Sequence, residues 1–182
     1  MTHIEFIFGG IGGQGIITMA VLLGHAAVIY DNLNAVQTQS YGPEARGSAS
    51  RAEVIIKEGR IDYPKVQQAD VFVCMSQEAY EKYISMLKKD GALIIDSDLV
   101  HPENPPTKKI YKIPATKLAE EEIGNRIVAN IIMLGAVIAI IDTVTPEAVK
   151  KTIAERFPKY ITLNYRAFDL GYNYGKSLIK GQ

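Results

Sequence analysis

The sequence predicts an α/β fold, a Rossmann-like three-layer sandwich in which helices cover both faces of a mostly parallel sheet. Two patterns indicate it. Short apolar runs typical of strands alternate with longer helical runs, and a glycine-rich turn joins the first strand to the first helix. Parallel neighbours need crossover helices, so the alternation favours a parallel sheet covered on both sides. Ligands of such folds bind at the carboxyl ends of the strands.

The first part of the chain is expected to form a strand, a helix and two further strands. IEFIF (residues 4–8) predicts a strand, and residues 16–31 predict a buried helix after the glycine turn. Two strand-like segments follow at 34–39 and 48–57. Between them lies SYGPEARG, whose Gly-Pro step and second glycine mark turns. This loop is longer than a tight hairpin allows.

The second part is expected to open with a βαβ crossover. Its parts are a buried strand at 69–75, an amphipathic helix at 77–91 and a second buried strand at 92–97. Two lysines and Gly91 at the end of the middle segment are typical of a helix C-terminus. The remaining elements are a strand at 109–115 and helices at 116–124, 127–141, 145–157 and 164–180.

Two of these helices carry clear local signals. The run at 127–141 is almost entirely apolar but is 15 residues long, short of the ~20 that a membrane-spanning helix needs. It is therefore expected to be a fully buried helix, with no membrane contact. Thr145 and Pro146 are the N-cap and the first residue expected of the next helix.

Composition limits the classes of function. The 182 residues are 47% apolar, enough for one core, and one domain over 1–182 is expected. The 20 basic and 20 acidic residues cancel, which gives no field to attract nucleic acid. The N-terminus lacks a secretory pattern, and the only cysteine has no disulfide partner in the chain, so we expect a cytoplasmic location.

The glycine turn satisfies one half of a dinucleotide-binding fingerprint. Gly10, Gly12 and Gly15 give GxGxxG between a strand and a helix, where exposed amides and a helix N-terminus can bind phosphate. The other half is an acid at the end of the second strand, which holds the ribose. That strand ends in VQTQSY, and Glu44 follows only after a Gly-Pro turn. NAD or FAD binding is therefore disfavoured.

A P-loop is excluded by the same stretch. Ile16 and Ile17 stand where a P-loop requires Lys and then Ser or Thr. A purely structural role remains open, in which the glycines let the helix pack close to the strand.

A second polar group lies in residues 37–51. Amides, hydroxyls, Tyr41, Glu44 and Arg46 stand between glycine-marked turns, an arrangement suited to a polar ligand or a partner surface. Arg46 could bind a phosphate or carboxylate in bidentate fashion. The alternative is a solvated loop in which Glu44 and Arg46 form a weak surface pair.

The two stretches together resemble a known family. GGIGGQG followed by QTQSYGPEARG is similar to the γ subunit, or γ domain, of the 2-oxoacid:ferredoxin oxidoreductases. The resemblance continues through ADVFVCMSQEAYEKY, GNRIVANIIMLGAV and NYRAFDLGY, nearly the whole chain, and is closest to the free-standing subunit of the 2-oxoglutarate:ferredoxin enzyme. Ser48 departs from the pattern, because family members often have a further glycine there.

The resemblance implies a multisubunit enzyme. Such a complex decarboxylates a 2-oxoacid on thiamine diphosphate and Mg²⁺, passes electrons through iron-sulfur clusters to ferredoxin, and releases an acyl-CoA. A cubane cluster takes four thiolates, whereas this chain has only Cys74, in a predicted core strand. The chain is therefore expected to be a noncatalytic subunit that holds no metal, with the cofactors on catalytic and iron-sulfur partner subunits.

The resemblance also implies that the glycine turn and the loop help to form the CoA site. CoA carries phosphates that a helix N-terminus and an arginine can bind. The loop could instead serve mainly to dock onto the catalytic subunits. The residues expected to make these contacts are Gly12, Gly13, Gln14, Gly15, Gln39, Ser40, Tyr41 and Arg46.

Two alternatives stay open. Within the family, the substrate could be pyruvate or a branched-chain 2-oxoacid in place of 2-oxoglutarate. From a different class, the chain could be an independent Rossmann-like nucleotide-dependent dehydrogenase, against which the missing ribose acid argues.

The remaining polar residues suggest structural roles. His3, His25 and His101 have no metal-ligand spacing. Asp96, at a strand end, is expected to cap the next turn, and Asn130, within an apolar helix, to satisfy a neighbouring backbone group.

Overall fold

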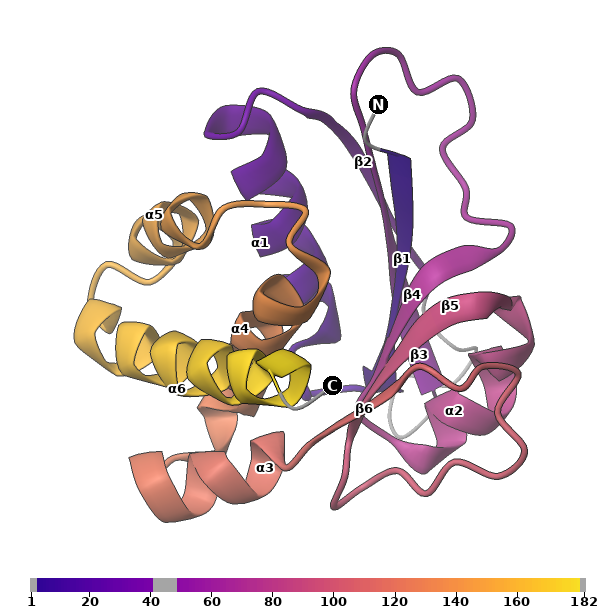
Figure 1. Cartoon of the computed structure of the whole chain (residues 1–182). Helices are drawn as coiled ribbons and strands as arrows, with labels where there is room; N and C mark the ends of the chain where they lie inside the picture. Colours follow the sequence, from indigo (N-terminus) through magenta and orange to yellow (C-terminus); the bar gives the residue numbers. More distant parts are fainter. Residues whose placement is uncertain (1–2, 41–48, 181–182) are drawn as a thin grey trace.

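The computed structural model describes residues 3–40 and 49–180, which form one six-stranded sheet flanked by helices (Figure 1). The strand order is β2-β3-β1-β4-β5-β6. Of these strands β3 alone runs opposite to the others, because it pairs antiparallel with both β1 and β2. The prediction of a mostly parallel sheet is confirmed. The strands are β1 (His3–Ile11), β2 (Asn34–Ser40), β3 (Ala49–Lys57), β4 (Ala69–Cys74), β5 (Leu87–Asp96) and β6 (Ile110–Ile113).

The helices cover the two faces of the sheet unequally. In Figure 1, α1, α4, α5 and α6 lie on one side of the sheet and α2 lies on the other. The π-helical turn Ala119–Ile123 extends α3, and the short 3-10 helix Arg126–Val128 leads into α4. The α-helices are α1 (Ile16–Ile29), α2 (Gln77–Tyr83), α3 (Ala115–Leu118), α4 (Ala129–Ile141), α5 (Pro146–Arg156) and α6 (Ile161–Lys180).

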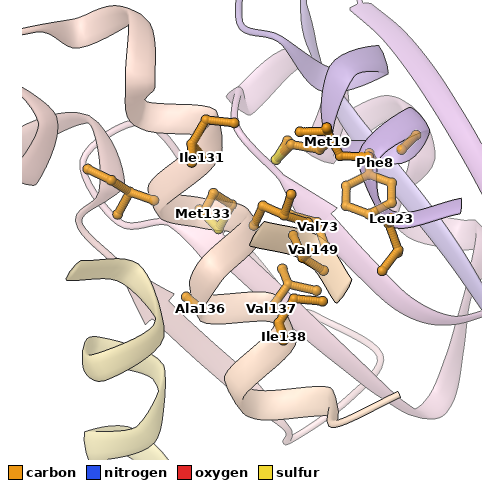
Figure 2. Close-up of a cluster of buried hydrophobic side chains, with 14 of the residues drawn as sticks. Phe8, Met19, Leu23, Val73, Ile131, Met133, Ala136, Val137, Ile138 and Val149 are labelled. Atoms are coloured by element: carbon orange, nitrogen blue, oxygen red, sulfur yellow. The ribbon is translucent and has the colours of Figure 1, made fainter. Parts of the chain in front are cut away.

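The larger core lies between the sheet and the four-helix layer. Phe8 and Val73 project from the strands toward Met19 and Leu23 of α1 and Val137 of α4 (Figure 2). Because successive side chains of a strand point to opposite faces, the neighbour of Phe8 packs into a separate, smaller core under α2. That second core includes Ile7, Phe72, Tyr80 and Leu93.

One predicted helix is wrong in its second half. Residues 84–91 do not continue α2, because a 3-10 turn follows and β5 begins at Leu87. Leu87 is buried and pairs with Ala69, and the register then shifts so that Val71 faces Ala92. Lys88 forms an ion pair with Asp70 at 2.6 Å. The lysines and the glycine that indicated a helix C-terminus therefore lie in an irregular strand, where pairing with β4 overrides local propensity.

The expected start of α5 is confirmed. Thr145 is the N-cap, its Oγ1 accepts a hydrogen bond from Ala148 N at 3.3 Å, and Pro146 is the first helical residue. Asp31, just beyond α1, accepts hydrogen bonds from Thr145 N at 2.6 Å and Thr145 Oγ1 at 2.7 Å. The cap of α5 is thereby fixed to the end of α1.

The apolar segment at 127–141 is buried except at its beginning. α4 starts at Ala129, and its residues are buried through Ala139. Ile127 precedes it and is 83% exposed, which contradicts the expectation of a fully buried segment. Within the described ranges, no helix is both long and apolar enough to cross a membrane.

Glycines allow α4 and α6 to touch backbone to backbone. A Cβ atom on Gly171 would overlap the carbonyl group of Ile132, and one on Gly135 would overlap the carbonyl oxygen of Phe168. A Cβ on Gly175 would lie 2.8 Å from the carbonyl oxygen of Ala136. Each approach is closer than real Cβ contacts, so these three positions require glycine.

Substituting Gly171 with alanine is expected to lower the free energy of unfolding by about 3 kcal/mol or more. Overpacking costs typically ~1–3 kcal/mol, and here the obstructing group is backbone, which cannot change rotamer. Urea unfolding followed by circular dichroism would measure the loss. Gly24→Ala is the matched control, because its Cβ would lie 3.9 Å from Val54 and alanine favours the helix by roughly 0.5–1 kcal/mol. Equal stability of Gly171→Ala and wild type would contradict the packing argument.

Candidate functional site

The glycine turn occupies the carboxyl edge of the sheet, between β1 and α1. Gln14 N donates to the carbonyl oxygen of Ile11 at 3.2 Å and closes the turn. Gly13 and Gly15 have φ angles of +92° and +72°, a region that disfavours other residues. Gly12 and Gly13 are exposed, so their backbone is open to a ligand.

Gln14 fixes this turn to the end of β4. Its Oε1 accepts a hydrogen bond from Ile11 N at 2.8 Å, and its Nε2 donates to the carbonyl oxygen of Met75 at 2.7 Å. Met75 N in turn donates to the carbonyl oxygen of Gly9 at 2.9 Å. The amide that was expected to contact a ligand is thus engaged with backbone at both ends. It positions the turn.

The N-terminus of α1 faces the same space. Its N-cap is Gly15, which supplies no side-chain cap, and its first turn carries no acid. The first amide groups of a helix have no partner within the helix, and the helix dipole makes this end positive. The turn and the helix together present donors suited to an anion.

A second wall comes from the segment before α4. Asn125 caps the 3-10 turn by accepting from Ile127 N at 3.1 Å, and this turn projects Arg126 toward the site. Asn130 lies directly against the glycine turn, where its Nδ2 donates to the carbonyl oxygen of Gly15 at 3.4 Å. A cavity of about 220 Å³ results, lined by Gly13, Gln14, Met75, Thr116, Arg126, Ile127, Ala129 and Asn130.

Arg126 is a candidate that sequence reasoning missed. It was placed within GNRIVANIIMLGAV, a stretch interpreted as helix packing. A signal was present, because Gly124 in a left-handed C-cap followed by Asn125 as N-cap marks a break between two helical segments. Because this break lies next to the carboxyl edge, Arg126 reaches the cavity beside the glycine turn.

The structure separates Gln39 and Ser40 from the glycine turn. Gln39 and Ser40 end β2 and are exposed, with β3 between them and β1. Two strand spacings put them about 10 Å from the turn. Ser50 of the intervening strand β3 contacts the end of β1 just before the turn, where its Oγ donates to the carbonyl oxygen of Gly10 at 3.3 Å. Tyr41 and Arg46 lie outside the described residues.

The acid of β3, the strand next to β1, is engaged away from the glycine turn. Glu53 on β3 is buried, forms an ion pair with Arg51 at 2.8 Å, and accepts hydrogen bonds from Thr38 Oγ1 and Val66 N. It pairs with Ile7, a residue of the core under α2. Glu53 therefore points to the face opposite α1 and does not complete a dinucleotide site.

Asp96 has the capping role expected of it. It is fully buried and accepts hydrogen bonds from Thr116 N at 2.9 Å, Thr116 Oγ1 at 2.7 Å and Asp98 N at 3.2 Å. Burial raises the pKa of this carboxyl group, although the bonds from Thr116 oppose the rise. Asp96 fastens the end of β5 to the start of α3. Across residues 3–40 and 49–180, no three metal-ligating side chains gather.

A glycine turn, the N-terminus of α1 and Arg126 lie together at the carboxyl edge of this α/β sheet, an arrangement suited to an anion. The chain belongs to the pyruvate ferredoxin/flavodoxin oxidoreductase family, which it matches over residues 5–174. It is 49% identical to the 2-oxoglutarate synthase subunit KorC of Methanocaldococcus jannaschii over 177 residues, 96% of this chain and 95% of that protein.

Two solved structures share the fold. The γ subunit of a keto/oxoacid ferredoxin oxidoreductase from Geobacter sulfurreducens superimposes with a TM-score of 0.86 at 40% identity, covering 96% of this chain and 99% of that one. A 2-oxoglutarate:ferredoxin oxidoreductase from Magnetococcus marinus, with 2-oxoglutarate, coenzyme A and succinyl-CoA bound, gives 0.87 at 22% identity. It covers 97% of this chain and 32% of that one.

Cys74 is expected to resist thiol reagents until the protein unfolds. It is buried, its Sγ donates to the carbonyl oxygen of Ser76 at 3.2 Å, and burial raises its pKa to about 12. The unfolded thiol ionises near pH 8.5, so the contribution of Cys74 to stability is complete below that pH and falls as pH rises toward 12. Labelling by a chromogenic disulfide at pH 8 would measure protection, with Ser85→Cys as an exposed control. Equal labelling rates would contradict the burial.

Proposed function

We propose that this chain is the γ subunit of a 2-oxoglutarate:ferredoxin oxidoreductase and contributes to its CoA site. The observation that carries the assignment is the near full-length identity to a 2-oxoglutarate synthase subunit, 49% over 177 residues. The reaction takes a 2-oxoacid, CoA and an oxidised acceptor to acyl-CoA, CO₂ and reduced acceptor. Thiamine diphosphate and Mg²⁺ supply the decarboxylation chemistry and iron-sulfur clusters the electron path, and we assign all of them to partner subunits.

The residues of this chain do not suit the redox steps. A cubane cluster takes four cysteine thiolates, but this chain has a single cysteine, Cys74, which is buried in β4. The chain is therefore a noncatalytic subunit, and its isolated form should be inactive. Its contribution lies in binding and in assembly.

The CoA contact is inferred from the carboxyl edge. Gly12, Gly13 and Gly15 present backbone next to the N-terminus of α1, which suits a diphosphate. Arg126 lines the same cavity and is 66% exposed in its side chain, with Glu120 at 3.4 Å. The exposed pair with Glu120 is weak, so Arg126 can leave it for a charge-assisted hydrogen bond to an anionic ligand, which would strengthen the binding of that ligand. Gln14 acts indirectly, because its amide holds the turn in place.

The loop after β2 has a separate place in the proposal. Ser40 and Ala49, the described residues on either side of it, lie at the carboxyl edge, where Ala49 pairs with Ile11. Gln39, Ser40, Tyr41 and Arg46 remain proposed contacts to CoA or to a catalytic partner. An independent dehydrogenase is not supported, because Glu53 is turned away from the glycine turn.

The assignment is tested by reconstituting the complex with and without this chain. We expect 2-oxoglutarate-dependent and CoA-dependent reduction of a low-potential acceptor to require it, and the complete complex to favour 2-oxoglutarate over pyruvate and branched-chain 2-oxoacids. The isolated chain serves as control and should be inactive with NAD as with ferredoxin. Undiminished turnover in its absence would contradict the subunit role, and preference for pyruvate would contradict the substrate assignment.

Arg126→Ala should raise the KM for CoA by about tenfold or more, with little change in kcat at saturating CoA. A hydrogen bond to a charged group is worth ~1.5–3 kcal/mol, and ~1.4 kcal/mol is tenfold in affinity. Arg46→Ala tests the loop in the same way. Arg60→Ala is the control, because Arg60 is exposed and lies outside the residues that line the cavity.

Dephospho-CoA distinguishes the phosphates. If Arg126 binds the 3′-phosphate, its substitution should not change the KM for dephospho-CoA, whereas contact with the diphosphate would preserve the full effect. An unchanged KM for both ligands, with normal assembly, would remove Arg126 from the proposed site.

A further inference from the structure

Two large apolar side chains stand out into solvent on the same side of the glycine turn. Ile127 is 83% exposed and Tyr160 is 62% exposed. Both line a single groove of about 470 Å³ that begins at Gly13 and Gly15 and runs between α4 and the turn joining α5 to α6. Apolar side chains of this size at the two lips of one groove indicate a contact surface.

The groove is lined mainly by apolar side chains, with buried amides among them. Ile131, Phe157 and Leu163 are apolar lining residues. Asn130 and Asn164 also line it, both buried, and Asn164 Nδ2 donates to the carbonyl oxygen of Tyr160 at 2.9 Å. Charged side chains are absent from the described lining residues.

Hydrogen bonds fix the backbone at both exposed residues. Ile127 N is bound by the Asn125 side chain at 3.1 Å, within a capped 3-10 turn. Tyr160 N donates to the carbonyl oxygen of Phe157 at 2.9 Å, and its own carbonyl oxygen accepts from Asn164 N at 3.0 Å as well as from the Asn164 side chain. A backbone that is ordered before binding loses little further entropy when a partner covers it.

The charges around the groove define the partner's chemistry. Arg156 and Lys159 flank Phe157 and Tyr160 and are exposed, and the structure shows no ion pair for either one among the described residues. The Arg156 guanidinium lies 5.9 Å from the Phe157 ring, beside the groove wall. The lip is therefore basic and the interior apolar. The complementary surface presents apolar side chains flanked by carboxylates.

We propose that this groove, between Ile127 and Tyr160, is the docking site for a partner subunit of the oxidoreductase, which inserts an apolar segment flanked by acidic residues. The inference rests on the proposed function, which supplies the partner subunits. The groove shares Gly13, Ile127 and Asn130 with the cavity that contains Arg126, whereas Tyr160 lines only the groove. A subunit docked there closes the open side of the glycine turn, so the ligand site is completed by two chains.

The test is assembly of the whole complex with variants of the full chain. Ile127→Asp and Tyr160→Asp should each weaken binding to the preassembled partner subunits by about tenfold or more, as for interface hot spots. Arg156→Glu with Lys159→Glu should weaken it at low salt and less at high salt. Tyr63→Asp is the matched control, since Tyr63 is 56% exposed and lies outside the groove residues. Thermal melts of each variant show whether it remains folded.

The outcomes separate the groove from the function. If the wild-type chain binds no thiamine- or cluster-bearing subunit, the proposed function fails. If the wild type assembles and the folded Ile127→Asp and Tyr160→Asp variants assemble equally well, the groove inference alone fails. Normal assembly with a raised KM for CoA would assign the groove to the ligand and overturn the docking proposal. A wild-type chain that is dimeric alone and becomes monomeric in Ile127→Asp would assign the groove to a second copy.

Discussion

The close approach of α4 and α6 determines the geometry of the ligand edge. Gly135, Gly171 and Gly175 bring the two helix backbones together. In consequence α4 is buried over most of its length, and its first turn is pressed against the glycine turn through Asn130. A Cβ on Gly15 would collide with that asparagine, so the turn and α4 limit each other. If side chains at these glycine positions changed the position of α4, Arg126 just before α4 would move relative to the glycine turn.

Two polar side chains fix the ends of the strands at this edge. Gln14 joins the turn after β1 to the end of β4, and Asp96 joins the end of β5 to the start of α3. Unpaired polar groups are costly inside a protein, so a satisfied side chain that bridges two backbone segments makes their relative position specific. The carboxyl edge is thereby held in one arrangement, and the role of Gln14 and Asp96 there is structural.

Sequence patterns predicted most of the fold because the elements obey local rules. The apolar stretch of α1, the Thr145-Pro146 start of α5 and the buried strand β4 all follow periodicity and capping. The end of α2 did not, because Leu87 pairs with Ala69 of β4, a contact distant in sequence, and residues 88–91 lie in the register shift that follows. Of the glycine turn, Gly13 and Gln14 line the cavity, and ligand contact by residues 12–15 stays a prediction. Arg126 was not predicted, because only packing brings the turn before α4 to the same edge.

The antiparallel strand β3 explains why a dinucleotide fingerprint fits this chain poorly. In a doubly wound sheet the strand beside β1 runs parallel to it and ends at the carboxyl edge, where its terminal acid can reach the ribose. Here the neighbour is β3, which starts at that edge, and its one acid lies in mid-strand on the opposite face. The glycine turn has the geometry suited to an anion but lacks an acid placed to hold a ribose.

A glycine turn that forms only part of a binding site suits a subunit whose site is completed by a partner chain. On the two proposals taken together, the partner and CoA occupy adjoining spaces that share Gly13, Ile127 and Asn130. Binding at either space then affects binding at the other. Linkage requires that the partner raise the affinity for CoA by the same factor as CoA raises the affinity for the partner. A chain without a redox centre can thus still control turnover, because it completes the CoA site only where the catalytic subunits are already in place.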